Sequence, residues 1–326
     1  MKEKKDILNF SNIHVSGELT DFYHDLNTQV LFLCRSLPAS VRTDALLFLM
    51  QYCGSTSGDM SDFFRNYHVP SWSILYWIER SAPESANFAG NHCQLALRAH
   101  AMAMLLHSMD DHICDGDIPA THLTLLLRSQ SWKLFTDALF RYAAEVPGGE
   151  ETALSFIDSY YSAICCMREP FSFDEYCSSF RKQMATWSVM PVLMCHDLSG
   201  KQDFADNVLE LYENFGIAWR IIDDIQDIEE DMSGGIKSSI YHILPDEGKS
   251  SWETALDDGP DKALIYIGQN NIIEKAALKA LRLIELSCSL AVNCGLTGLS
   301  KELLELSQPL RIRTGQVSGN RTVNGI

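Results

Sequence analysis

Apolar side chains recur along most of the 326-residue chain at spacings of three and four, which is the repeat of a helix with one buried face. Alternating apolar and polar runs, which are typical of β-strands, are few. Breaks rich in Gly, Pro and polar residues separate these segments at 147–149, 197–200, 233–235 and 245–260. The pattern predicts helices at 18–35, 40–54, 71–81, 86–114, 120–145, 150–168, 173–196, 202–232, 261–268, 271–293 and 299–311.

The predicted helices indicate an all-α fold in which helices pack into a bundle. No internal repeat and no linker divides the chain, so we expect a single domain over residues 1–314. The polar, Gly-containing segment 315–326 is expected to be a disordered tail.

Composition restricts the classes of partner. A formal net charge of −17 argues against binding nucleic acid and against simple attraction to an anionic membrane, and it means that a phosphorylated substrate needs local cations. The ten cysteines include no Cys-x-x-Cys pair, which favours reduced thiols. No run is long and apolar enough to span a bilayer, and no signal-type apolar region follows the charged start. We therefore expect a cytoplasmic protein that is not an integral membrane protein.

Two clusters of aspartates each follow an apolar helical segment, which argues against simple solvated helix ends. Residues four apart share one face of a helix, and like charges at this spacing repel each other. The repulsion favours a compensating cation, and carboxylate oxygens are ligands that suit Mg²⁺. The first cluster contains Asp110, Asp111, Asp115 and Asp117; the stripe of the second runs from aromatic to acidic through Phe215, Trp219, Asp223, Asp227 and Asp231.

These two clusters resemble the paired aspartate-rich motifs of the class I trans-isoprenoid synthases, the family of chain-elongating prenyltransferases and many terpene cyclases. The segment Leu-Leu-His-Ser-Met-Asp-Asp that ends at Asp111 is similar to the first motif. The segment Phe-Gly-Ile-Ala-Trp-Arg-Ile-Ile-Asp-Asp-Ile-Gln-Asp that ends at Asp227, with Gly-Gly-Ile-Lys after it, is similar to the second. The resemblance covers most of 86–240 and implies a helical bundle around a central cavity.

The resemblance implies that the two motifs face each other and hold three Mg²⁺ ions that bind the diphosphate of a prenyl diphosphate. The ions offset the charge on the departing diphosphate, which leaves an allylic carbocation. By this resemblance Asp110, Asp111, Asp223 and Arg181 are expected to be catalytic. The expected metal ligands are Asp110, Asp111, Asp115, Asp223, Asp227 and Asp231. Because Cys114 stands where the common Asp-Asp-x-x-Asp motif has its third aspartate, either Asp115 or Asp117 could ligate metal.

Basic and aromatic residues complete the expected site. The resemblance implies that Arg181 senses the diphosphate, as in cyclases, although Arg181 and Lys182 could equally stand where elongating enzymes have a Lys-Thr pair. Lys237 could supply another cation. Trp219, Phe215 and Trp187 are expected to line the hydrocarbon pocket, where aromatic faces stabilise a carbocation.

Departures from the elongating enzymes favour cyclisation. Those enzymes have an Arg-Arg pair after the first motif, whereas 118–122 of this chain reads Ile-Pro-Ala-Thr-His. Without arginines a second diphosphate is expected to bind poorly. The sequence therefore predicts a Mg²⁺-dependent terpene synthase, a diphosphate lyase that acts on a linear prenyl diphosphate. The alternatives are a prenyltransferase that uses isopentenyl diphosphate or another acceptor, and a non-catalytic subunit of the same fold. The resemblance implies a homodimer.

Overall fold

The computed structural model describes residues 15–54, 62–65, 67–82, 90–114, 116–165 and 168–315. These residues form α-helices and two short 3₁₀ helices, and no β-strand occurs among them. The all-α fold predicted from the periodicity is confirmed. The α-helices are α1 (Thr20–Ser36), α2 (Arg42–Tyr52), α3 (Val69–Ser81), α4 (Asn91–Cys114), α5 (His122–Ala143), α6 (Gly149–Ile164), α7 (Phe173–Gln183), α8 (Ala185–Ser199), α9 (Gln202–Gln226), α10 (Ile228–Gly234), α11 (Ser239–Ile243), α12 (Asp246–Glu253), α13 (Ala255–Asp258), α14 (Asp261–Gln269), α15 (Ile272–Asn293) and α16 (Thr297–Arg313).

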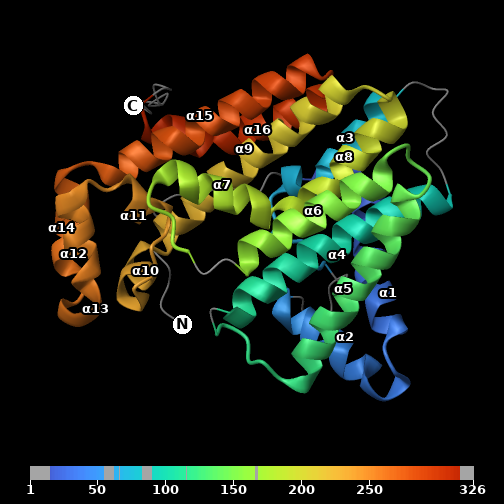
Figure 1. Cartoon of the computed structure of the whole chain (residues 1–326), viewed down its shortest axis with the longest axis horizontal. Coiled ribbons are helices and arrows are strands. Elements are labelled where there is room, and N and C mark those ends of the chain that lie inside the picture. Colours follow the sequence, from blue (N-terminus) through green and yellow to red (C-terminus); the bar gives the residue numbers. More distant parts are fainter. Residues whose placement is uncertain are drawn as a thin grey trace, which may run out of the picture.

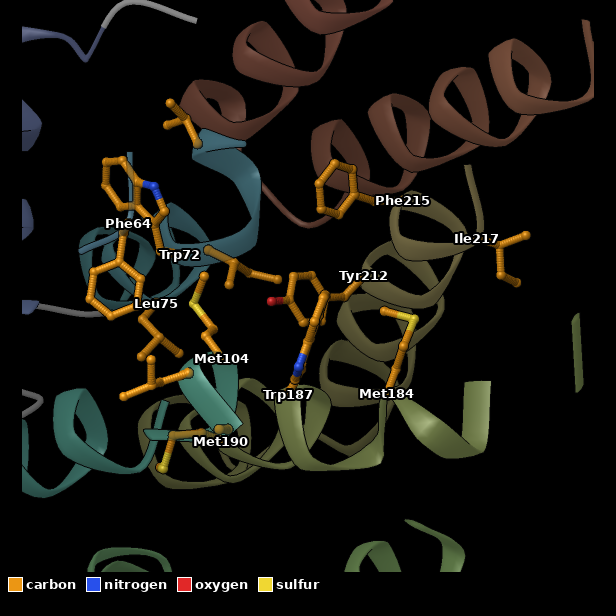
Figure 2. Close-up of a cluster of buried hydrophobic side chains, with 14 of the residues drawn as sticks. Phe64, Trp72, Leu75, Met104, Met184, Trp187, Met190, Tyr212, Phe215 and Ile217 are labelled. Carbon is orange, nitrogen blue, oxygen red and sulfur yellow. The ribbon is translucent and has the colours of Figure 1, made fainter. Parts of the chain in front are cut away.

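The longer helices form one bundle (Figure 1), and their buried side chains make a continuous apolar core. Helix α4 contacts α1, α5 and α8, while α9 contacts α8 and α15, so α8 lies between the two helices that carry the aspartate clusters. Figure 2 shows the core where α3, α4, α8 and α9 meet, with Trp72, Met104, Trp187 and Tyr212 fully or almost fully buried. The short helices α12–α14 lie to one side of the bundle, at the left of Figure 1.

Local sequence signals set several helix ends. Thr121 begins α5 with a capping box, in which its side chain accepts from the Thr124 amide while the Thr124 hydroxyl accepts from the Thr121 amide. The Ser172 hydroxyl caps α7 through the Glu175 amide. Gly200 and Gly235 follow α8 and α10 in the left-handed conformation, which glycine adopts without steric cost.

Three local predictions were wrong. The helix expected at 173–196 is two helices, because the backbone of Met184 interrupts it between α7 and α8. The helix expected at 202–232 also breaks, at Asp227, whose φ of −99° and ψ of 14° are not helical. The segment 245–260, expected to be a break, is largely helical as α12 and α13 because burial of Trp252 outweighs its polar composition.

The remaining expectations concern the ends of the chain and the membrane. The predicted disordered tail, apart from Gly315, lies outside the described residues. Among the helices that are described, none combines the length and the apolar character needed to cross a bilayer.

Candidate active site

The two aspartate clusters lie at the C-terminal ends of α4 and α9, where each helix stops. A carboxylate is disfavoured there by about 0.3–1 kcal/mol, because the exposed carbonyls give this end of a helix a partial negative charge. After α4, Gly116 has a φ of +80° and the Ile118 amide donates to the His112 carbonyl. This turn folds the chain back, so that Asp117 joins the end of α4.

Six aspartates from α4, α9, α10 and the turn after α4 line one cavity of about 330 Å³, here called the acidic cavity. Trp219 also lines it, one helical turn before Asp223. The sequence prediction that the two clusters face a common space is therefore consistent with the geometry. The six aspartates are Asp111, Asp117, Asp223, Asp224, Asp227 and Asp231.

Burial makes the carboxylates of the acidic cavity costly to ionise. It raises the pKa of Asp223 to about 6, with the Arg220 guanidinium acting in the opposite direction. It raises the pKa of Asp231 to about 7, with the charge of Asp224 adding to the effect. The Oδ2 atom of Asp231 is buried without a hydrogen-bond partner. Such an arrangement is stabilised by any cation that enters the cavity.

Asp224 is fixed by the protein itself. Its carboxylate is 2% exposed and accepts from the Tyr176 hydroxyl at 3.0 Å and from the Ser239 amide at 2.7 Å. Arg220, one turn earlier on α9, places Nε 2.9 Å from Asp224 Oδ1. Arg220 was not among the predicted site residues, although its spacing of three and four from Asp223 and Asp224 is a signal for ion pairs on a helix.

Asp110, adjacent to Asp111, does not line the acidic cavity. Its carboxylate accepts two hydrogen bonds from Arg128 of α5, at 2.8 and 3.0 Å, and one from the Tyr160 hydroxyl of α6 at 3.0 Å. These contacts tie the end of α4 to α5 and α6. Asp115 lies outside the described residues.

A second cavity of about 330 Å³, here called the basic cavity, shares His107, Asp111 and Arg220 with the acidic one. Arg168 and Lys237 bring two further cations to its wall. The Lys237 ammonium lies 2.9 Å from a carboxylate oxygen of Glu169, which also lines the cavity. The two cavities together therefore place a wall that carries three cations beside an acidic one.

The other expected cations lie outside both cavities. Arg181 is half-buried on α7, with Nε 3.5 Å from a carboxylate oxygen of Glu213 on α9. Lys182 is exposed. Gln183, the next residue, is the one that lines the basic cavity.

The three expected aromatic residues have different positions. Trp219 lines the acidic cavity, and its ring centroid lies 5.9 Å from that of Trp187. Trp187 is buried and contacts the ring of His107 edge-on, with centroids 4.5 Å apart. Phe215 is buried in the core, stacked on Tyr212, and lines neither cavity (Figure 2). Of the three, only Trp219 has a face on the acidic cavity.

The donor set suits Mg²⁺ in the presence of a phosphate ligand. Among the described residues, no three His, Cys, Asp or Glu side chains converge closely enough to chelate a metal ion by themselves. Mg²⁺ is typically held by one or two carboxylates together with phosphate oxygens and water, so a full set of protein ligands is not required. The unpartnered Asp231 oxygen, Asp111 and Asp223 line one cavity and are the carboxylates that would take this part.

Solved structures with this fold cover nearly the whole chain. Geranylgeranyl pyrophosphate synthetase from Pyrococcus horikoshii is 13% identical, with a TM-score of 0.62 over 91% of this chain and 97% of that one. Geranylgeranyl pyrophosphate synthase from Lactobacillus brevis is 11% identical, with a TM-score of 0.64 over 92% and 97%. Decaprenyl diphosphate synthase from Rhodobacter capsulatus is 11% identical, with a TM-score of 0.60 over 92% and 98%.

No family model and no curated protein matches the sequence. At these low identities, the likeness to solved structures concerns the fold. The chain has the all-α fold of the class I trans-isoprenoid synthases.

Proposed function

We propose that this protein is a prenyltransferase that binds an allylic prenyl diphosphate between α4 and α9 and transfers the prenyl group to a second substrate, such as isopentenyl diphosphate. The observation that carries the proposal is the acidic cavity, in which carboxylates from both helices face one space beside the cations of the basic cavity. The structurally similar proteins are all synthases of geranylgeranyl or longer prenyl diphosphates, which favours transfer over cyclisation.

Different residues of the chain bind different parts of the substrate. Asp111, Asp223 and Asp227 line the acidic cavity and would hold Mg²⁺ together with oxygens of the diphosphate. When bound, the ions supply positive charge to the diphosphate as the carbon–oxygen bond breaks and its electron pair leaves with that group. Lys237 and Arg168 bind phosphate oxygens from the basic cavity. The ring of Trp219 faces the allylic cation and stabilises it by cation–π attraction.

Cyclisation is the second candidate function. The first arginine after the α4 aspartates is Arg128, and its guanidinium is already engaged by Asp110. This arrangement favours an enzyme that needs no second diphosphate, because an anion site without free guanidinium groups binds weakly. A terpene synthase would quench the cation within the same prenyl chain.

The experiment that separates the candidates is mass-spectrometric product analysis. The purified chain is incubated with Mg²⁺ and C10, C15, C20 or C25 prenyl diphosphate, each with and without isopentenyl diphosphate. Prenyl transfer predicts longer diphosphates that form only when isopentenyl diphosphate is present. Hydrocarbon or alcohol from one diphosphate alone would instead establish cyclisation. If no substrate releases diphosphate, the remaining alternative is a non-catalytic subunit of the same fold.

Three alanine variants test the assignment of the site. Asp111→Ala and Asp223→Ala should each lower diphosphate release by at least about 100-fold, because each removes charge that the bound ions require. Asp206→Ala is the matched control, since Asp206 is an exposed acid at the other end of α9. Normal release in both site variants would contradict the proposal.

The proposal includes a homodimer, which rests on the family resemblance, and a cytoplasmic location, which rests on the sequence. Sedimentation analysis of the purified chain tests the first. The assignment of Asp111, Asp223 and Asp227 as metal ligands is likewise part of the proposal.

A further inference from the structure

Arg220 stands at the boundary between the two cavities and lines both of them. Its Nε atom lies 2.9 Å from an Asp224 oxygen and 3.2 Å from the Tyr176 hydroxyl. Its Nη1 atom lies 3.5 Å from an Asp223 oxygen. The side chain is therefore held at one edge by Asp224 and Tyr176, with a longer contact to Asp223.

The contacts of Arg220 leave part of its donor capacity for a ligand. A guanidinium has five N–H donors in a planar fork, and those contacts use Nε and Nη1. These contacts do not use Nη2 or the second N–H of Nη1. Since the guanidinium remains protonated at every accessible pH, it is a permanent positive charge inside the acidic cluster.

The charged residues around Arg220 indicate which kind of ligand binds beside it. On the acidic side, Arg220 faces aspartates that would repel an anion. On the basic side, two further cations, Arg168 and Lys237, lie beside the acids Asp111 and Glu169 and attract an anion. An anion that lies in the basic cavity with one end toward α9 meets all three cations. Planar N–H pairs match two oxygens of a phosphate group, and this geometry is why Arg binds phosphate bidentately.

We propose that Arg220 binds the diphosphate directly, without a bridging metal ion, and so gives the chain a metal-independent component of diphosphate affinity. The inference rests on the proposed function, because it names a further residue of the same substrate site. When Arg220 Nη1 turns to the phosphate, its 3.5 Å contact with Asp223 is given up and the Asp223 carboxylate is released toward the acidic cavity. The tighter contact with Asp224 keeps the guanidinium in place.

Calorimetric titration of the full chain with inorganic pyrophosphate, in buffer containing EDTA, tests the proposal. The unmodified chain should bind one pyrophosphate without divalent metal, and Arg220→Gln should bind it at least about tenfold more weakly, because a charged hydrogen bond is lost. The matched control is Arg98→Gln. Arg98 is a half-buried α4 arginine that bonds Gln29 and covers the Phe32 ring, away from both cavities, and its variant should bind as the unmodified chain does.

A double variant controls for misfolding of the single variant Arg220→Gln. Arg220→Gln alone leaves the buried Asp224 carboxylate without its cation, whereas Arg220→Gln with Asp224→Asn removes both charges together. The double variant should retain the helical circular dichroism of the unmodified chain and show the same loss of pyrophosphate affinity. Unchanged affinity in the double variant would overturn the inference.

The titration is repeated with Mg²⁺ to keep the two proposals apart. If the unmodified chain binds pyrophosphate only with Mg²⁺, the role of Arg220 is wrong while the proposed function stands. If it binds pyrophosphate under neither condition, both proposals fail. Metal-free binding that depends on Arg220 supports the inference.

Discussion

At the scale of single residues, the acidic cavity contains side chains that are unfavourable for stability. Asp111 and Asp223 lie in the last turns of their helices, where the helix dipole opposes negative charge. Burial raises the pKa of Asp223 to about 6 and that of Asp231 to about 7. Shifts of this kind gather at functional sites, because a group that costs folding energy is retained for what it binds.

Glu302 is a buried acid away from this site, and we predict that it makes stability depend on pH. Burial raises its pKa from 4.5 to about 7, although the Ser73 hydroxyl and Trp77 Nε1 donate to its carboxylate. The folded chain then binds one more proton than the unfolded chain between about pH 4.5 and pH 7. Stability should therefore fall as pH rises through this window, by an amount on the order of 3 kcal/mol.

Urea denaturation of the unmodified chain and of Glu302→Gln, at pH 5 and pH 8, checks this prediction. The variant should lose less stability between the two pH values, because glutamine keeps an acceptor for Trp77 and does not ionise. Glu305→Gln is the control, since Glu305 is exposed on the same helix. An equal loss in the unmodified chain and Glu302→Gln would refute a role for Glu302.

At the scale of elements, close helix contacts depend on glycine. A methyl group at Gly298, near the start of α16, would lie 2.1–2.4 Å from three ring atoms of Trp77 on α3. The indole of Trp77 is only partly buried, but its Nε1 donates to Glu302, so it cannot yield by that distance without moving the helices apart. We predict that Gly298→Ala destabilises the chain by about 1–3 kcal/mol.

Gly268→Ala is the matched control for this prediction. Gly268 is also helical, in α14, and nothing lies within 4 Å of the position of its added methyl group. This variant should be neutral or slightly stabilising, because alanine favours a helix. Thermal unfolding of both variants is the measurement, and equal midpoints would show that α3 and α16 are not packed as described.

Helix breaks illustrate what periodicity can predict. The apolar repeat located nearly all the long helices, because a buried stripe is a local property of the sequence. It did not find the interruptions at Met184 and Asp227, whose neighbours all fit a helical pattern. Such breaks depend on packing with other helices, since α7 and α8 both contact α9 and α10 contacts α13.

At the scale of the whole molecule, the acidic cavity joins two helices that are more than a hundred residues apart in the sequence. A ligand that binds both walls should stabilise the fold. We predict that Mg²⁺ and pyrophosphate together raise the thermal unfolding midpoint, with a stabilisation of about 2.7 kcal/mol when the ligand is at 100 times its Kd.

Differential scanning calorimetry with and without the two ligands measures this effect. Asp223→Asn should abolish most of the shift, because Asp223 lines the acidic cavity, whereas Asp206→Asn on the exposed part of α9 should retain it. Chelation of Mg²⁺ by EDTA should reverse most of the stabilisation. A shift that survives in Asp223→Asn would place the metal elsewhere.

The helical fold and the two acidic clusters at the ends of apolar helices could be predicted from the sequence, because both are properties of neighbouring residues. Which acids share the cavity depends instead on how distant helices pack. Asp110 and Asp111 are adjacent in sequence but about 100° apart around α4, so one meets Arg128 and the other meets the α9 aspartates. Likewise Arg181 was expected in the site and Arg220 was not, because the partner of a cation is chosen by how helices pack.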